Sequence, residues 1–298
     1  MRPNYSRLST QPQENSDDQC YPPLMKGFKF DRILGRGGYG CVCLYVKNDI
    51  KVAIKFEKTD GNFQVNTILN ESLILKKLSK NKVNFEPAYI DHGLAKHAMK
   101  GKEINYNYLM LSYLDEPLVD YYERKKQSLN ISKIFLGMLD ALQQIHDAGI
   151  IHRDISLNNF MVKNDSIKII DFGTSREYML RDNQHISLQT GKQLRGTTYT
   201  ASSFNHQGYE LSRRDDIISM IYCAMTLILD KLPWYEESLN YNAKDAQQQI
   251  LSSSILQKKI EMFEKRQDFE DDRIIKLLEL IKTIEKCSFD KRPDYQYI

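Results

Sequence analysis

From Ile151 to Gly173 the sequence reads Ile-His-Arg-Asp-Ile-Ser-Leu-Asn-Asn-Phe-Met-Val-Lys-Asn-Asp-Ser-Ile-Lys-Ile-Ile-Asp-Phe-Gly. This stretch contains three side chains that suit a hard metal ion, the carboxylates of Asp154 and Asp171 and the amide of Asn159. Two short apolar runs between them are separated by the turn-forming residues 163–166, which predicts a small hairpin. The hairpin carries the carboxylates at its two ends. In this arrangement, one carboxylate can hold a metal ion over a phosphoryl group, and the other can orient a hydroxyl that attacks it.

A glycine motif lies upstream, between two segments that are predicted to be strands. The motif is Gly-x-Gly-x-x-Gly followed by a valine, and its residues are Gly35, Gly37, Gly40 and Val42. Dinucleotide-binding folds share these glycines, but in them a helix starts at the last glycine. Here residues 41–46 alternate and are rich in β-branched and aromatic types, which predicts a strand. A glycine loop between two strands lets backbone amides approach phosphates; a glycine-rich hairpin without a ligand is the alternative.

The next strand ends in a lysine that needs an acidic partner. Residues 51–56 read Lys-Val-Ala-Ile-Lys-Phe, and Lys55 is a candidate to bind phosphates. A helix is predicted over residues 66–80, and within it Glu71 is our choice for the partner of Lys55. Glu86 comes too late in the chain and is predicted to lie in a loop. An exposed Glu71 that pairs with Lys76 or with nothing is the alternative.

Further strands and one long helix are predicted on the way to the 151–173 stretch. Residues 86–95 and 103–114 read as strands, and the second runs into a hinge at Asp115-Glu-Pro117. Residues 130–146 have apolar side chains on one helical face, and Gly149 is positioned to end that helix. Beyond the stretch, Asp216 opens an apolar run, where it can cap a helix and also bind the backbone of the 151–154 loop.

Composition limits the class of protein. The chain has 298 residues and a net charge of only +3, which does not favour nucleic-acid binding. Five scattered cysteines predict free thiols and a reducing compartment, so we expect an intracellular protein of the cytoplasm, the nucleus or both. The longest nearly apolar run, 217–229, is too short to span a bilayer, and we expect no membrane association. Residues 1–25 are polar and are expected to form a disordered tail.

These motifs together resemble eukaryotic protein kinases over about residues 28–298. The glycine loop, Lys55, Glu71, the catalytic-loop spacing His152-Arg-Asp…Asn159 and Asp171-Phe-Gly173 carry the resemblance. Within that family the sequence resembles the casein kinase 1 group, which includes the vaccinia-related and tau-tubulin kinases. Three segments support this narrower resemblance: Gly196-Thr-Thr-Tyr-Thr-Ala-Ser202, Ser212-Arg-Arg-Asp-Asp216 with Leu232-Pro-Trp234, and Pro293-Asp-Tyr-Gln-Tyr-Ile298.

The resemblance implies an α+β, bilobal fold with a small β-rich N-lobe over about 26–114 and a larger helical C-lobe over about 115–298. It implies a monomeric Ser/Thr kinase that uses ATP and Mg²⁺, with Asp154 orienting the hydroxyl and Asn159 and Asp171 holding the metal. Lys55, paired with Glu71, would hold the phosphates. The residues expected at the nucleotide are Leu34, Gly35, Gly37, Gly40, Val42, Ala53, Lys55, Leu111, Leu114, Met161 and Asp171.

Two residues depart from the family pattern. Ser156 replaces a lysine that normally steadies the γ-phosphate, and Tyr199 replaces an arginine that often reads phosphate-primed substrates. Basic residues near Tyr199 in the sequence, Arg181, Lys192 and Arg195, still favour acidic protein substrates. Two other functions stay open at this point: a pseudokinase or scaffold that binds ATP with little turnover, and a small-molecule phosphotransferase.

Overall fold

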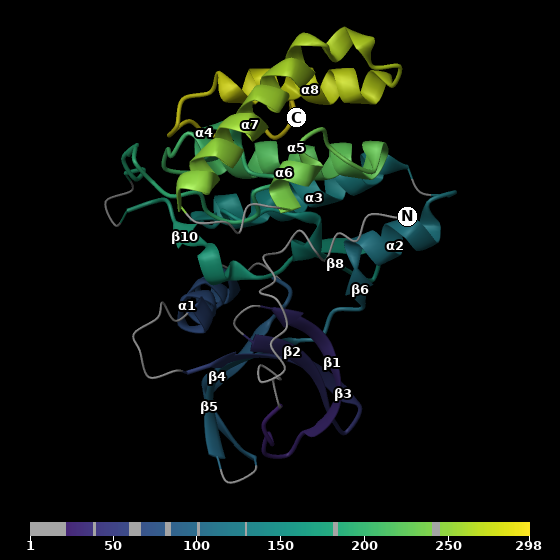
Figure 1. The fold of residues 1–298 in the computed structure, drawn as a ribbon. Coiled ribbons are helices and arrows are strands. Elements are labelled where there is room, and N and C mark those ends of the chain that lie inside the picture. The colour runs from purple at the N-terminus through teal and green to yellow at the C-terminus, as the bar shows by residue number, and fades with distance from the viewer. Residues whose placement is uncertain are drawn as a thin grey trace.

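The structure is a computed structural model that describes residues 22–37, 40–59, 67–80, 85–99, 102–128, 130–180, 184–239 and 245–298. A β-rich N-lobe forms one end of the molecule and a helical C-lobe forms the other (Figure 1). The elements are β1 (Lys29–Gly37), β2 (Gly40–Lys47), β3 (Ile50–Lys58), α1 (Thr67–Lys80), β4 (Tyr89–Met99), β5 (Lys102–Ser112), β6 (Glu116–Pro117), α2 (Leu118–Lys125), α3 (Ile131–Asp147), β7 (Ile150–Ile151), η2 (Leu157–Asn159), β8 (Phe160–Lys163), β9 (Ser166–Ile169), η3 (Phe172–Thr174), β10 (Arg176–Glu177), α4 (Ser203–His206), α5 (Arg213–Leu229), α6 (Tyr235–Leu239), α7 (Asp245–Glu264), η4 (Arg266–Asp268) and α8 (Asp272–Glu285).

The N-lobe is built on an antiparallel sheet. Among the described residues it has five strands in the order β1-β2-β3-β5-β4. The glycine loop joins β1 to β2, as expected, and Gly37 pairs with Gly40 across its base. A Cβ on Gly40 would lie 1.8 Å from the carbonyl oxygen of Phe56 on β3. Gly40 is therefore needed for the close approach of β2 to β3, a reason that the sequence argument did not give.

The segment before β1 contacts β2 and the core of the N-lobe. Residues 1–21 of the predicted tail lie outside the described residues, while the Tyr45 hydroxyl donates to the carbonyl of Pro23 at 2.5 Å. Met25 packs against the N-lobe core. The expectation of free thiols is confirmed for Cys43, Cys223 and Cys287. It is wrong for Cys41, which is in a disulfide.

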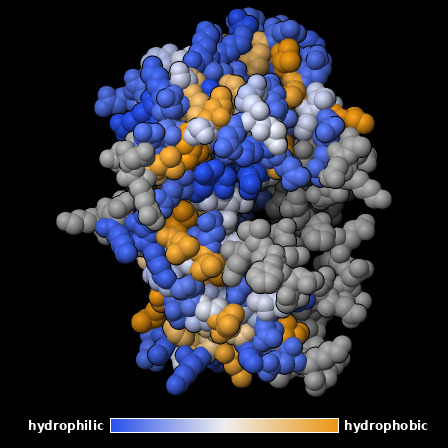
Figure 2. Space-filling view, turned by 90° about the vertical axis from the view of Figure 1, so that its left-hand side faces the viewer, coloured by the Kyte–Doolittle hydropathy of each residue, from blue (hydrophilic) through white to orange (hydrophobic). Residues whose placement is uncertain are grey.

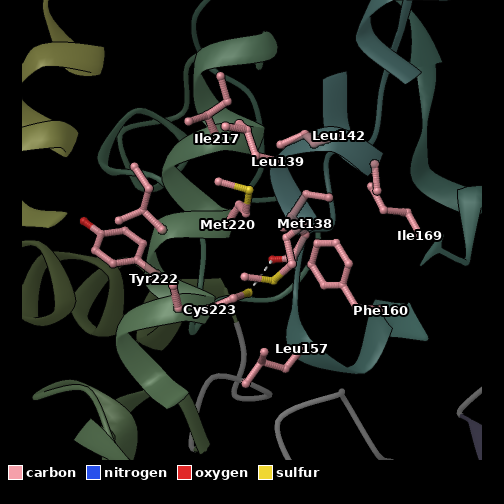
Figure 3. Packing of buried hydrophobic residues seen from close by; sticks show 14 of the residues in the cluster. Met138, Leu139, Leu142, Leu157, Phe160, Ile169, Ile217, Met220, Tyr222 and Cys223 are labelled. Atoms are coloured by element: carbon pink, nitrogen blue, oxygen red, sulfur yellow. Dashed lines mark hydrogen bonds between the residues drawn. The ribbon is translucent and has the colours of Figure 1, made fainter. Parts of the chain in front are cut away.

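The C-lobe core forms where α3 and α5 pack together. Met138, Leu139 and Leu142 of α3 face α5 in Figure 3, and Phe160 and Leu157 close the core beside the catalytic loop. The amide of Asn130 accepts a hydrogen bond from the backbone N–H of Ser132, which caps the start of α3. The chain after the helix turns at Gly149, whose φ is 80°. The core thus supports the segment that carries Asp154.

Helix α5 begins differently from the prediction. Asp216 was expected to cap its N-terminus, but the capping box is formed by Ser212 and Asp215. The helix therefore starts at Arg213, and Asp216 turns inward on its first turn, buried at 2% exposure. The expected hairpin is present as β8 and β9, with positive φ at Asn164 and Asp165 in its turn. In the described part of the chain, no helix is both long and apolar enough to cross a membrane.

Candidate active site

A lysine and two carboxylates meet between the lobes. Lys55 lies on β3, and its Nζ donates to Oε2 of Glu71 at 3.0 Å and to Oδ1 of Asp171 at 2.8 Å. Glu71 lies on α1 and is only 1% exposed, so the alternative of an exposed Glu71 is wrong. Glu86, which was set aside as a partner of Lys55, instead forms an ion pair with Lys163 of the hairpin. These contacts join β3, α1 and the 171–173 segment at one point.

Lys55 and Asp171 keep each other ionised, whereas burial raises the pKa of Glu71. Burial acts to lower the pKa of Lys55, but the carboxylates of Asp171 and Glu71 outweigh it and raise this pKa above its ordinary value. The Lys55 ammonium is also the main reason that the pKa of Asp171 lies below its usual range. At neutral pH the site therefore presents a cation beside an ionised carboxylate.

The 171–173 segment is held in place by α1. Asp171 adopts a left-handed backbone conformation with a φ of 63°, so its side chain leaves the hairpin toward Lys55. The backbone N–H of Phe172 donates to Oε1 of Glu71 at 3.1 Å. The Asn70 amide donates to the carbonyl of Gly173 at 2.9 Å. Helix α1 thus fixes both the lysine and the segment that carries Asp171, and the sequence argument had missed Asn70.

Hydrogen bonds to the side chain of Asp216 on α5 fix the backbone of the catalytic loop. Its carboxylate accepts hydrogen bonds from the backbone N–H groups of His152 at 2.7 Å and Arg153 at 2.8 Å. The ring of His146 lies 3.0 Å from the same carboxylate. Arg153 has a φ of 67°, a backbone conformation that these hydrogen bonds help to maintain. The second role predicted for Asp216 is therefore observed.

Asp154 is oriented by a residue to which the sequence argument gave no role. Its Oδ1 accepts hydrogen bonds from both the backbone N–H and the hydroxyl of Thr197, each at 2.7 Å. Gly196 permits this approach, because a Cβ there would lie 2.4 Å from the Arg153 carbonyl and because its φ is 73°. Burial raises the pKa of Asp154, whereas the hydrogen bonds from Thr197 oppose that rise.

Asn159 lies on the same loop. Its amide nitrogen donates to the backbone carbonyl of Asp154 at 2.8 Å, which leaves the amide oxygen as the atom that can bind a cation. No group of three or more His, Cys, Asp and Glu side chains among the described residues could hold a metal alone. A magnesium ion at Asp171 and Asn159 would therefore take phosphate oxygens and water as further ligands, which is the usual arrangement for this ion. The residues present fit the expected magnesium.

The residues expected around the adenine come from neighbouring strands. Val42 pairs with Gly35 across β1 and β2, and Ala53 pairs with Leu111 across β3 and β5. Met161 lies on β8, opposite Pro117 at the start of the C-lobe. The remaining two positions are Leu34, which is 39% exposed on β1, and Leu114, which is 4% exposed. Because Leu114 is buried, contact with a nucleotide at this position would come from its backbone.

The sequence of the chain is similar to those of known proteins. The family model for the protein kinase domain matches residues 28–297. The chain belongs to the protein kinase family. A probable casein kinase I homolog of Encephalitozoon cuniculi (strain GB-M1) is 30% identical over 278 residues, which cover 90% of this chain and 81% of the relative. The kinase thus falls in the casein kinase 1 group, and kinases use ATP and magnesium.

The kinase has a cluster of basic residues beside its catalytic loop. Of these residues, the sequence predicted only Lys192 as a contact for acidic substrates. Arg153, Arg176 and Lys192 lie 3.8, 3.3 and 3.9 Å from the carboxylate of Glu210. We call these four residues the Glu210 cluster. The middle of the face on which β10 lies is strongly hydrophilic (Figure 2). Three cations around one carboxylate leave the cluster with a positive charge.

The two residues that depart from the family pattern, Tyr199 and Ser156, are both buried. Tyr199 is buried at 2% exposure, and its hydroxyl accepts a hydrogen bond from the backbone N–H of Leu232 at 2.7 Å. It therefore supports the loop from inside and is not available to a substrate. Ser156 is also buried, and it borders a small pocket together with Leu157 and Thr197.

Proposed function

We propose that this kinase transfers the γ-phosphoryl group of ATP to serine or threonine hydroxyls of acidic protein substrates. The observation that carries the proposal is the state of Asp154. One oxygen of this carboxylate is fixed by Thr197. The other oxygen accepts no hydrogen bond from any described residue, so it can accept one from a substrate hydroxyl.

The other residues then have the roles that phosphoryl transfer requires. Lys55 binds the α- and β-phosphates and is oriented by Glu71. Asp171 and Asn159 hold magnesium, which neutralises charge on the phosphates when it is bound. Gly35, Gly37 and Gly40 have no side chains, so the backbone between β1 and β2 can approach the phosphates closely.

A pseudokinase or scaffold is the competing function, and Ser156 is its best argument. A missing lysine removes one cation from the γ-phosphate, whereas Lys55, Asp154, Asn159 and Asp171 are all present in the chain. The loss of one charge contact slows transfer but leaves the groups that orient the hydroxyl and the metal. We therefore favour an active enzyme.

The preference for acidic substrates rests on the Glu210 cluster. Burial lowers the pKa of Arg153 to about 10, and repulsion from Arg195 and Arg176 adds to this. Arg153, Arg176 and Arg195 repel one another electrostatically. An acidic side chain from a substrate would reduce this repulsion. The side chains of Arg176 and Lys192 are 37% and 35% exposed, and a peptide can reach them.

Two other arginines near the loop are occupied by structural contacts. Arg213 donates to the carbonyl of Asp290 at 2.5 Å, and Arg214 donates to the carbonyl of Cys287 at 2.7 Å. Both are only 7% exposed, so they join α5 to the C-terminal segment and do not read substrates. Arg181, which was also expected to contribute, lies outside the described residues.

Incubation of the purified chain with γ-labelled ATP and casein tests the proposal. We expect label on casein serine and threonine, identified by phosphoamino-acid analysis, and far less label when Asp154→Asn replaces the wild type. Binding of ATP without labelled protein would support the scaffold instead. Label on small hydroxyl compounds but not on protein would support the small-molecule phosphotransferase.

A further inference from the structure

Lys259 is a cation buried inside the C-lobe. It lies on α7 and is 1% exposed. Its Nζ lies over the rings of Tyr222 and Trp234, 4.7 and 5.1 Å from their centroids. The same ammonium donates a hydrogen bond to the backbone carbonyl of Ala201. In Figure 3, Tyr222 lies on the side of α5 away from Phe160, and both rings that Lys259 contacts belong to the C-lobe core.

Keeping a charge in this place is unfavourable for stability. Burial lowers the pKa of Lys259 to about 7, and the charge of Glu285 on α8 offsets only part of this effect. A methionine could pack between the same two rings without removing a charge from water. A methionine could make neither the hydrogen bond to Ala201 nor the contacts of the ammonium with the two rings. Of these contacts, the hydrogen bond is the one that Lys259 makes directly to the backbone of residue 201.

Ala201 belongs to residues 196–202, which we call the substrate loop. Other side chains fix this loop at neighbouring positions. The Trp234 indole donates to the Tyr199 carbonyl at 2.7 Å, and the Thr200 hydroxyl donates to the Ile155 carbonyl at 2.6 Å. Since Ile155 follows Asp154 directly, the position of the substrate loop is coupled to the catalytic loop.

We propose that Lys259 is a positioning residue, which holds the substrate loop from α7 so that a protein hydroxyl is presented to Asp154. The proposal rests on the proposed function, because it concerns the protein substrate of the same site. Among the described residues, Lys259 reaches the substrate loop by its hydrogen bond to Ala201 and through the ring of Trp234, which donates to Tyr199. Its removal should therefore affect the use of the peptide but not the use of ATP.

The test compares Lys259→Met with Lys258→Met. Lys258 precedes it on the same helix, but its side chain is 35% exposed and pairs with Glu237 at 2.6 Å. For each variant, kcat and KM are measured for a serine peptide, KM is measured for ATP, and the hydrolysis of ATP is measured without peptide. The melting temperature is measured in parallel.

In Lys259→Met we expect kcat/KM for the peptide to fall by about tenfold, because misplacing a reactive group by a fraction of an ångström has this order of effect. The ATP parameters should stay within about twofold, and the melting temperature should stay equal or rise. Lys258→Met should behave as the wild type does. If Lys259→Met does not fold, Lys259→Leu serves instead, because it also has no donor for the Ala201 carbonyl, and the same division between peptide and ATP parameters is expected.

Three results would overturn the inference, the last of them by overturning the proposed function. Peptide phosphorylation and ATP hydrolysis that fall together would indicate a general structural role for Lys259. An unchanged kcat/KM for the peptide in a folded variant would show that the substrate loop does not need this contact. A wild-type chain that hydrolyses ATP but labels no peptide would overturn the proposed function, and this inference with it.

Discussion

The half of the active site around Lys55 is joined by charges; we call it the N-lobe half, although Asp171 reaches it from the C-lobe. The C-lobe half, around Asp154, is joined mainly by backbone hydrogen bonds. In the first half, the side chains of Lys55 and Asp171 remain 20% and 45% exposed within their ion pair. In the second half, Asp216 holds two backbone N–H groups at 2% exposure. We therefore expect substitutions in the first half to abolish activity while the protein stays folded. Substitutions in the second half should also lower the free energy of unfolding, because Asp216 is part of the core.

The largest expected effect is on turnover in Asp154→Asn. The neutral amide is a poor acceptor for the hydroxyl proton, so kcat should fall by roughly 10²–10⁴. ATP affinity should not change, because Asp154 orients the substrate hydroxyl and is not a ligand of the nucleotide or the metal. Steady-state kinetics with a serine peptide gives both values, and Asp140→Asn, on an exposed part of α3, is the control. Turnover close to that of the wild type would contradict the role of Asp154.

A second pair of variants compares the stability of the two halves. Asp216→Ala leaves the buried N–H groups of His152 and Arg153 without an acceptor, at about 1–3 kcal/mol each, so unfolding should become easier by about 2–6 kcal/mol. Glu71→Gln keeps an acceptor for the Phe172 N–H and leaves Lys55 paired with Asp171, so it should cost less, about 0.5–1.5 kcal/mol, although activity falls. Urea denaturation measures both. Equal losses in the two variants would remove the distinction between the halves.

Ser156→Lys should act in the opposite direction. A lysine at this position would restore a cation near the γ-phosphate and raise kcat, with a ceiling of roughly tenfold to a hundredfold for one charged contact of ~1.5–3 kcal/mol. Ser156→Met has a similar bulk without the charge and is the control. If kcat does not rise, another cation, Lys192 or Arg195, already fills this role.

The smallest effect concerns the substrate sequence. Matched serine peptides with Asp, Ala, Lys or phosphoserine three residues upstream should be used in the order Asp, Ala, Lys. Phosphoserine should stay within about tenfold of Asp, because the buried Tyr199 cannot form a bidentate site for a phosphate. The measurement is kcat/KM. A preference for phosphoserine of tenfold or more would show that arginines of the Glu210 cluster read the phosphate.

Much of the N-lobe half could be predicted from the sequence. Lys55 ends a strand, Glu71 lies on the buried face of the next helix, and Asp171 follows a hairpin, so each side chain lies at a recognisable place in a local element. The structure brings these three together. Their local patterns carry the information because strand and helix periods decide which side chains face inward.

Other contacts could not be predicted, because they join residues that share no local pattern. Thr197 reaches Asp154, and Lys259 reaches Ala201, across 43 and 58 residues of chain. The capping of α5 was assigned to Asp216 because two adjacent acids both fit that role in the sequence. Only the structure shows that Asp215 makes the cap while its neighbour turns toward the catalytic loop.

The most direct test of the division between the halves is the affinity for magnesium-ATP, measured by calorimetry on Asp171→Asn and Asp154→Asn. A neutral amide is a poorer ligand than a carboxylate for a hard cation, so Asp171→Asn should lose most magnesium-dependent ATP binding. Asp154→Asn should bind magnesium-ATP as the wild type does. Equal loss in both variants, or full binding in both, would contradict the account.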